Sequence, residues 1–182
     1  ENYDKAEEIC RGIIKERPEY TLAYIFLARI EEEKNNIRKA LEYYEKAVAI
    51  EPLNVSLKLS YCETLKNNRD FSKTGQICDE LLKDESVSNN PEIKSQIGII
   101  LTEIFKDDLA FEVLSEALQE DNSLARAWNY LGIIHWRKKD FSPSLEAYNK
   151  SIELDPKVAV TYNNLGTLYL TLFLKNRDNE TN

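Results

Sequence analysis

The sequence repeats itself with a period of 34 residues. When the chain is shifted by 34 positions, the stretch 128–132 (WNYLG) falls on 162–166 (YNNLG), and the aromatic residue, an asparagine, the leucine and the glycine are kept. A period of this length is typical of helical repeats that stack into a solenoid. It constrains the fold more than composition does, because 182 residues with 42% hydrophobic content could also form one ordinary globular domain.

Each repeat predicts two amphipathic helices joined by a short turn. In the clearest repeat, apolar residues at helical spacing predict a first helix over about 125–138 and a second over about 143–154. Gly132 leaves room for the second helix to cross closely, since a Cβ there would push the backbones apart. We expect Ser142 to be the N-cap of the second helix and Pro143 to stand at its first position.

The same pattern divides the whole chain into one array. The expected parts are the second helix of a truncated repeat at 1–18, full repeats at 21–54, 55–90, 91–124 and 125–158, and the first helix of a further repeat with a polar tail at 159–182. Because the first and last parts lack their partner helices, we expect the chain to be a segment of a longer protein.

The residues of two repeats resemble the tetratricopeptide repeat (TPR) family. That family's pattern is an aromatic residue, Leu-Gly, a small residue, a second aromatic residue and a closing proline. The matching residues are Trp128, Leu131, Gly132, Tyr148 and Pro156 in one repeat, and Tyr24, Leu27, Ala28, Ala40, Tyr44, Ala47 and Pro52 in another. The resemblance implies an all-α fold, an α-solenoid that forms a right-handed superhelix with a concave groove lined by the first helices.

Composition and cysteine usage exclude several classes of function. The net charge of −8 argues against nucleic acid as a partner, because phosphate binding needs a basic face. Cys10, Cys62 and Cys78 fall on positions that pack in other repeats, so we expect small buried thiols rather than disulfides or metal ligands. Reduced thiols favour a cytoplasmic location. No stretch is apolar enough to predict membrane insertion.

The sequence offers little for catalysis. The single histidine, His135, stands where a packing residue is expected, and we interpret it as wedged between helices. There is no second histidine, no glycine-rich phosphate loop and no serine elbow. We therefore expect no enzyme activity in this segment, no cofactor and no metal site.

Binding is the better candidate. The resemblance implies that the concave face of the later repeats presents Arg126, Asn129, Ile133, Trp136, Arg137, Asn163 and Thr167. Asn129 and Asn163 stand one repeat apart, so their amides could bind a peptide backbone as successive rungs. Trp136 is either a rigid anchor for a ligand or a packing residue. The lysines of the family's chaperone-binding members are missing, so we do not expect binding to chaperone tails.

These residues predict a protein–protein interaction scaffold that binds an extended peptide or a helix in the groove. Earlier repeats are mostly acidic on this face, so the best ligand has a basic portion there and an acidic or carboxylate portion near Arg126 and Arg137. Two alternatives remain open. The segment could be the substrate-recognition arm of a larger enzyme such as an O-GlcNAc-transferase-like glycosyltransferase. It could also self-associate through the exposed C-terminal helix, around 172–174.

Overall fold

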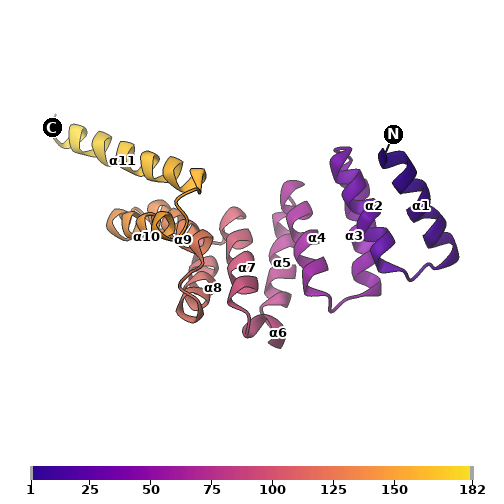
Figure 1. Ribbon diagram of the computed structural model, residues 1–182. Helices are drawn as coiled ribbons and strands as arrows, with labels where there is room; N and C mark the ends of the chain where they lie inside the picture. The colour runs from indigo at the N-terminus through magenta and orange to yellow at the C-terminus, as the bar shows by residue number, and fades with distance from the viewer. Residues whose placement is uncertain (1, 181–182) are drawn as a thin grey trace. The chain divides into compact units, whose positions relative to one another are not determined.

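The computed structural model describes residues 2–180. Within that range all secondary-structure elements are α-helices (Figure 1). The chain forms two compact units, Glu1–Lys83 and Asp84–Asn182, which are described separately below. Both units consist of consecutive helices that pack on their neighbours in the sequence. The predicted all-α solenoid fold is therefore confirmed.

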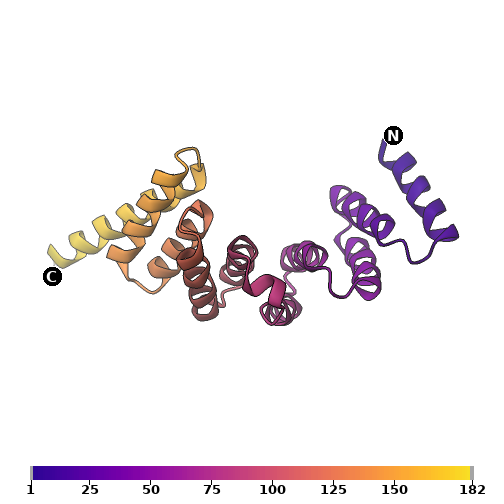
Figure 2. The ribbon, with the colours of Figure 1, turned by 60° about the horizontal axis from the view of Figure 1, so that its bottom comes forward.

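Unit 1 contains one single helix and two helix hairpins. Its helices are α1 (Asn2–Glu16), α2 (Thr21–Glu33), α3 (Ile37–Ile50), α4 (Val55–Asn67) and α5 (Phe71–Leu81). Helix α2 packs along α3, and helix α4 packs along α5. The short connections make the two helices of each pair antiparallel (Figure 2). Helix α1 packs against α2 through a cluster of Cys10, Ala23 and Leu27.

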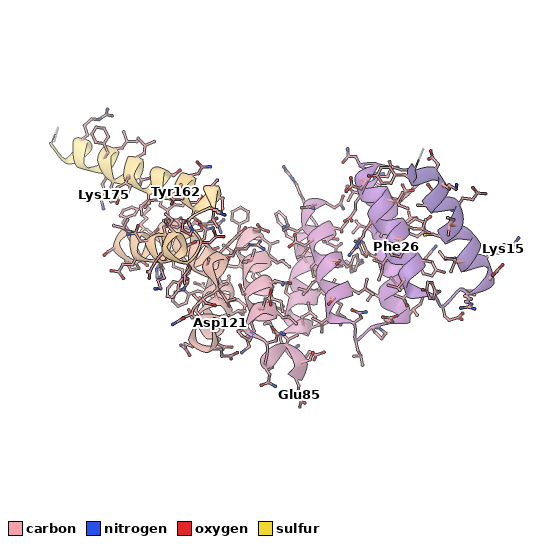
Figure 3. The ribbon with its side chains drawn as sticks, viewed as in Figure 1. Lys15, Phe26, Glu85, Asp121, Tyr162 and Lys175 are labelled. Atoms are coloured by element: carbon pink, nitrogen blue, oxygen red, sulfur yellow. The ribbon has the colours of Figure 1, made fainter. Side chains whose placement is uncertain are left out.

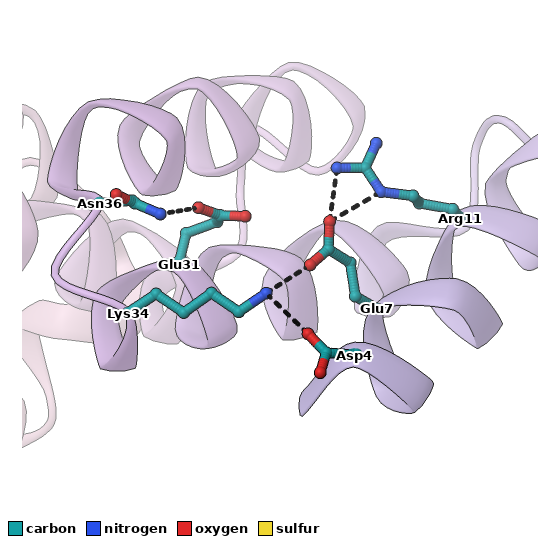
Figure 4. A network of polar contacts seen from close by, with 6 residues as sticks. All are labelled: Asp4, Glu7, Arg11, Glu31, Lys34 and Asn36. Atoms are coloured by element: carbon teal, nitrogen blue, oxygen red, sulfur yellow. Dashed lines mark hydrogen bonds and ion pairs between the residues drawn. The ribbon is translucent and has the colours of Figure 1, made fainter. Parts of the chain in front are cut away.

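Ion pairs tie α1 to the end of α2 (Figure 4). The Lys34 Nζ lies 2.6 Å from a carboxylate oxygen of Glu7 and 3.8 Å from one of Asp4. The other Glu7 oxygen accepts hydrogen bonds from the Arg11 guanidinium at 2.7 and 2.9 Å. The Lys34 ammonium and then the Arg11 guanidinium hold the pKa of Glu7 below its usual value.

Unit 2 begins with a four-residue helix that the sequence pattern did not predict. Its helices are α6 (Glu85–Ser88), α7 (Pro91–Glu103), α8 (Asp107–Glu120), α9 (Ala125–Arg137), α10 (Phe141–Leu154) and α11 (Ala159–Glu180). Helix α6 is capped by the Asp84 carboxylate and buries Val87 completely. Helices α7 and α8 form one hairpin, α9 and α10 form another, and α11 packs mainly on α10.

The four hairpins share one turn, in which the second residue after each first helix adopts a left-handed conformation. These residues are Asn35, Arg69, Phe105 and Lys139, with φ between 59° and 65°. In the last turn the next amide, that of Asp140, donates to the His135 carbonyl at 2.9 Å, and the other three turns make the same bond. This six-to-one hydrogen bond closes a Schellman motif, so the main chain alone defines the turn.

The turn explains why the prediction of Ser142 as N-cap is wrong. Helix α10 begins at Phe141, and Asp140 occupies the cap position without a side-chain cap bond. The left-handed Lys139 redirects the chain early, so the second helix starts two residues sooner than the sequence pattern indicated. Pro143 is consequently the third helical residue, still within the first turn, where a backbone N–H has no intrahelical acceptor.

Small residues on first helices make room for large ones on second helices, as expected for Gly132. A Cβ added at Gly132 would lie 2.5 Å from Cε1 of Tyr148, and one at Gly98 would lie 2.7 Å from Cγ of Leu114. Such distances are shorter than real Cβ contacts, so the two helices approach as closely as the backbone allows.

The last helix is longer than its counterparts. Helix α11 has 22 residues, compared with 13 in α9. The polar tail expected at the end of 159–182 continues this helix to Glu180, since no glycine or proline between 167 and 180 interrupts it. The remaining two residues of that tail, 181–182, lie outside the described part of the chain.

Candidate functional site

A pocket of about 370 Å³ lies between the C-terminal end of α9, the start of α10 and the middle of α11. We call it the Trp136 pocket; it is lined by Trp136, Arg137, Lys139, Phe141 and Thr171. Two of these residues are aromatic and two are cationic, although the whole chain has a net charge of −8. The lining therefore combines apolar surface with positive charge.

Trp136 is held in place by the neighbouring first helix. Its indole Nε1 donates to the Thr171 hydroxyl at 3.5 Å, and its ring is only partly buried. The two interpretations left open by the sequence are thus compatible, because the side chain contacts α11 and also lines the pocket. A partly exposed indole that bonds to a neighbouring helix is the kind of residue that anchors ligands.

Arg137 already has an anionic partner. Its guanidinium lies 2.6 Å from the Asp107 carboxylate, donates to the Thr102 carbonyl at 2.8 Å, and stacks 4.7 Å from the centre of the Phe105 ring. These bonds fix the side chain between α7, α8 and α9. Arg137 can shape the pocket wall, but its charge is shared with Asp107.

The other cations at the pocket are more exposed. Lys139 stands in the left-handed turn and is exposed, and the Lys175 Nζ lies 5.1 Å above the Phe141 ring. Figure 3 labels Lys175 on α11. No ion pair of either lysine is found within the described residues. These two ammonium groups are the positive charge that a ligand could use.

The two asparagines of the expected ladder, Asn129 and Asn163, lie in different surroundings. Asn164 Nδ2 donates to Oδ1 of Asn129 at 2.9 Å, and Asn129 is only 2% exposed. Asn163 is exposed, and its backbone carbonyl accepts a hydrogen bond from the exposed Thr167 hydroxyl at 2.9 Å. Asn129 thus joins α9 to α11 inside the unit, while the amide of Asn163 faces solvent.

The remaining predicted residues lie along α9. Ile133 is partly buried and Arg126 is exposed. Beside Arg126, the Tyr130 hydroxyl donates to the Glu103 carboxylate at 2.5 Å, and burial raises the pKa of Tyr130 above its usual value. Tyr130 therefore stays neutral and links α7 to α9.

Sequence reasoning did not assign Lys139, Phe141 or Lys175 to the site. One signal could have found Phe141: the first residue of a second helix follows the turn directly and lies beside the end of the first helix. No signal pointed to Lys175, since its position depends on the unexpected continuation of α11.

The cysteines are buried, as expected. Cys62 and Cys78 are both 0% exposed on facing helices of one hairpin, and Cys10 is 7% exposed. The hydrogen bond with the Cys78 thiol, together with burial, raises the pKa of Cys62, and burial raises that of Cys10. Raised values keep both groups as thiols, which are weaker nucleophiles than thiolates.

His135 packs between helices, as interpreted from the sequence. Its ring meets the Phe111 ring edge-on with centroids 5.5 Å apart, and its Nδ1 lies 3.8 Å from an Asp140 carboxylate oxygen. Within residues 2–180, no cluster of three or more His, Cys, Asp or Glu side chains could hold a metal ion. In the same range, no helix has the length and apolar character needed to cross a lipid bilayer.

Comparison with known families finds one kind of match. Models described as "Tetratricopeptide repeat" match residues 22–52, 125–158 and 147–181. Among curated proteins, the Tetratricopeptide repeat-containing protein trd-1 of Caenorhabditis elegans is 20% identical over 167 residues, and Protein FlbA of Caulobacter vibrioides is 24% identical over 166. The matches cover 92% and 90% of this chain but only 16% and 27% of those proteins.

Solved structures resemble the fold at low identity. A tetratricopeptide repeat protein from Parabacteroides merdae superposes with a TM-score of 0.79 at 17% identity, covering 96% of this chain and 69% of that one. YrrB, described as a TPR protein with an unusual peptide-binding site, gives 0.72 at 17% identity, with 89% and 82% covered. The Cut9–Hcn1 complex of APC/C gives 0.74 at 16% identity, with 93% and 33% covered. At these identities the similarity establishes the fold alone.

Proposed function

The chain belongs to the tetratricopeptide repeat family, and from this premise we propose that unit 2 binds a partner protein through a short extended peptide. The peptide lies along α9 and α11 and places an acidic residue or a terminal carboxylate, next to an apolar side chain, in the Trp136 pocket. The proposed role is that of an interaction scaffold rather than a catalyst.

The observation that supports this proposal is the chemistry of the Trp136 pocket. The indole of Trp136 and the ring of Phe141 offer flat apolar surface, while Lys139 and Lys175 place ammonium groups at its edge. An aliphatic or aromatic side chain gains by covering the rings, and a neighbouring carboxylate gains by pairing with the lysines. A neutral or basic peptide gains only the first of these.

Groups on α9 and α11 can bind the rest of the peptide. The exposed amide of Asn163 can both donate to and accept from a peptide backbone. Ile133 adds partly exposed apolar surface between Arg126 and Trp136. Arg126, at the N-terminal end of α9, can pair with a second acidic residue. Direct contact with Asn129 is not part of this proposal, because its amide oxygen is already bonded to Asn164.

YrrB is described as having a peptide-binding site, and this likeness supports peptide binding as the mode of interaction. Because the chain spans only 16% and 27% of its curated relatives, the activity and partners of a longer protein remain proposals. A role as the recognition arm of a larger enzyme is one of them.

The first test uses the two tryptophans as reporters. A peptide is selected on the whole chain from a random display library and then synthesised. Trp128→Phe leaves Trp136 as the only indole, and Trp136→Phe leaves Trp128, whose Nε1 donates to the Asn122 carbonyl outside the pocket. We expect the peptide to shift the emission of Trp136 and to leave that of Trp128 unchanged. Equal responses of the two reporters would contradict binding at the pocket.

Charge reversal tests the polarity of the ligand. Lys139→Glu combined with Lys175→Glu should weaken binding of an acidic peptide by about tenfold or more, or about 1.4 kcal/mol, since two favourable pairs become repulsive. The matched control is Lys15→Glu with Lys39→Glu, which changes the net charge equally at exposed positions of unit 1. Isothermal titration calorimetry measures the affinity of both variants for the peptide. Equal losses of affinity in the two variants would mean that only the net charge of the chain matters.

A further inference from the structure

Unit 1 has a groove of its own, distinct from the Trp136 pocket of unit 2. It holds a cavity of about 300 Å³ between α1 and α3, over α2, and we call it the α1–α3 groove. Its lining comes from all three helices: Arg11, Ile14, Lys15, Tyr24, Leu27, Tyr43 and Lys46. Three of these residues are cationic and none is acidic. Ala6 and Cys10, at the hairpin-interface positions of α1, do not line it, so the groove lies away from the face on which a first helix would pack.

The floor of the groove contains a polar group without a partner. Leu27 and Tyr24 of α2 are 1% and 9% exposed. Within residues 2–180 the Tyr24 hydroxyl makes no hydrogen bond. A hydroxyl on a side chain buried to this extent usually has a partner. Because the charged groups that line the groove are all cations, the acceptor for this hydroxyl has to come from a ligand.

The two walls of the groove carry cations that can still bind an anion. On α1, the Arg11 guanidinium uses Nε and one Nη2 hydrogen to bond the Glu7 carboxylate (Figure 4). A guanidinium has five N–H donors, so most of them remain available. On α3, the Lys46 Nζ lies 5.8 Å from the centre of the Tyr43 ring and has no ion pair in the part of the chain that the structure describes.

The equivalent groove one period later is closed by carboxylates of the chain itself. There the Tyr61 hydroxyl of α4 donates to the Glu45 carboxylate of α3 at 2.9 Å. On the other side, the Lys58 Nζ of α4 lies 3.3 Å from a carboxylate oxygen of Glu80 on α5. The two glutamates therefore satisfy the donors of the first helix that lies between them.

The α1–α3 groove has cations where the next groove has these carboxylates. A shift of 34 places Arg11 on Glu45 and Lys46 on Glu80. The same shift places Tyr24, whose hydroxyl is unpartnered, on the lysine that pairs with Glu80. Both internal acceptors are thus replaced by donors. Two carboxylates from another molecule would supply what the sequence of this groove lacks.

We propose that the α1–α3 groove binds an acidic segment of a partner protein, in which an apolar residue stands between two acidic ones. The apolar side chain covers Ile14 and Leu27. One carboxylate pairs with Arg11 on α1, and the other pairs with Lys46 on α3 and accepts from the Tyr24 hydroxyl. The net charge of −8 disfavours nucleic acid here, because the rest of the chain repels a long polyanion. This site does not depend on peptide binding in unit 2.

Synthetic peptides test the chemistry of the ligand. Each carries a fluorophore and one aliphatic or aromatic residue between two glutamates, and each has a counterpart with two glutamines. By fluorescence anisotropy with the whole chain, the glutamate peptides should bind about tenfold more tightly than their counterparts. Both tryptophans lie in unit 2, so binding in the groove should leave their emission unchanged. Equal affinities for the two sets, or binding that always shifts the Trp136 emission, would overturn the proposal.

Removal of one hydroxyl tests the location of the site. Tyr24→Phe removes an oxygen that has no partner in the described chain, so the urea midpoint should not change. The affinity for the glutamate peptides should nevertheless fall about tenfold, because a hydrogen bond to a carboxylate is lost. Tyr20→Phe is the matched control, since Tyr20 is exposed just before α2 and does not line the groove. If Tyr24→Phe binds the peptides as well as Tyr20→Phe does, the ligand does not occupy this groove.

Charge reversal on α3 tests the polarity of the contact. Lys46→Glu should weaken binding of the glutamate peptides about tenfold or more, because a favourable pair becomes repulsive. A peptide with lysine in place of one glutamate should regain affinity for this variant. Arg38→Glu changes the net charge equally at an exposed position of the same helix outside the groove, and it should have little effect. Equal losses in the two variants, or no recovery with the lysine peptide, would overturn the proposal.

Discussion

Among single residues, the tightest steric constraint is the space beside the hairpin glycines. Gly132 and Gly166 occupy the same position of the repeat but differ in surroundings, since only Gly132 faces a ring. Gly132→Ala should lower the free energy of unfolding by about 1–3 kcal/mol, because the Tyr148 ring must move. Gly166→Ala should raise it by about 1 kcal/mol, since alanine favours the helix and meets no atom.

Urea unfolding followed by circular dichroism, at a concentration low enough to keep the chain monomeric, measures both glycine variants. The prediction concerns the sign: the two substitutions should shift the midpoint in opposite directions. Shifts of the same sign would mean that helix propensity, not the Tyr148 contact, decides the outcome.

Glu31 is a carboxylate buried in the α2–α3 hairpin, at only 2% exposure, with the Asn36 amide at 2.9 Å (Figure 4). The repeat places Leu65 and Leu101 at the same position, both buried. Glu31→Leu should therefore raise the free energy of unfolding by about 1 kcal/mol, because an apolar side chain of similar size removes the cost of burying a charge. Asn36 is exposed and can bond to water instead.

Thermal unfolding of Glu31→Leu gives the measurement, with Glu33→Leu as the control. Glu33 is exposed on the same helix, so its substitution should add no stability. A lower melting temperature for Glu31→Leu than for the unmodified chain would show that the carboxylate stabilises the hairpin.

Between elements, α1 depends on charge for part of its attachment to α2. Lys34 and Arg11 lower the pKa of Glu7 from 4.5 in the folded chain, so the unfolded chain binds a proton more readily. The stabilisation is complete above the unfolded value near 4.5 and is lost as pH falls through the lower folded value. Glu7→Gln should therefore be less stable than the unmodified chain at pH 7, and the difference should shrink below pH 4.5.

Urea midpoints measured between neutral and acidic pH test this dependence. Glu8→Gln is the matched control, because Glu8 is exposed on the same helix. Its difference from the unmodified chain should be small at every pH. A gap for Glu7→Gln that is independent of pH would mean that the ion pairs contribute nothing to the attachment.

For the whole molecule, the repeat period predicted the helix pairs because each hairpin is a local unit. The same glycine recurs at the crossing of two hairpins, so Gly98 and Gly132 could be assigned without coordinates. The left-handed turn was not predicted, because Asn35, Arg69, Phe105 and Lys139 share no side-chain property. The turn is defined by main-chain hydrogen bonds, which do not require particular residue types.

The candidate site was harder to predict than the fold because its contacts do not follow the period. Three bonds between successive first helices of unit 2 join residues 35 apart, one more than the repeat: Asn129 to Asn164, Trp136 to Thr171 and Thr102 to Arg137. A shift of 34 relates Asn129 to Asn163, but it does not reveal that Asn129 bonds to Asn164. The neighbouring helix is displaced along its axis, and only coordinates report that displacement.

The shared turn has a consequence for how such a chain can vary. The six-to-one amide hydrogen bond closes each turn without help from side chains. The left-handed position can therefore be an asparagine, an arginine, a phenylalanine or a lysine, and the backbone makes the same turn in each hairpin. The side chain at the left-handed position of each turn can therefore change while the surrounding backbone stays the same. Lys139 borders the Trp136 pocket, so we propose that a substitution at this turn changes ligand preference and leaves the backbone unchanged.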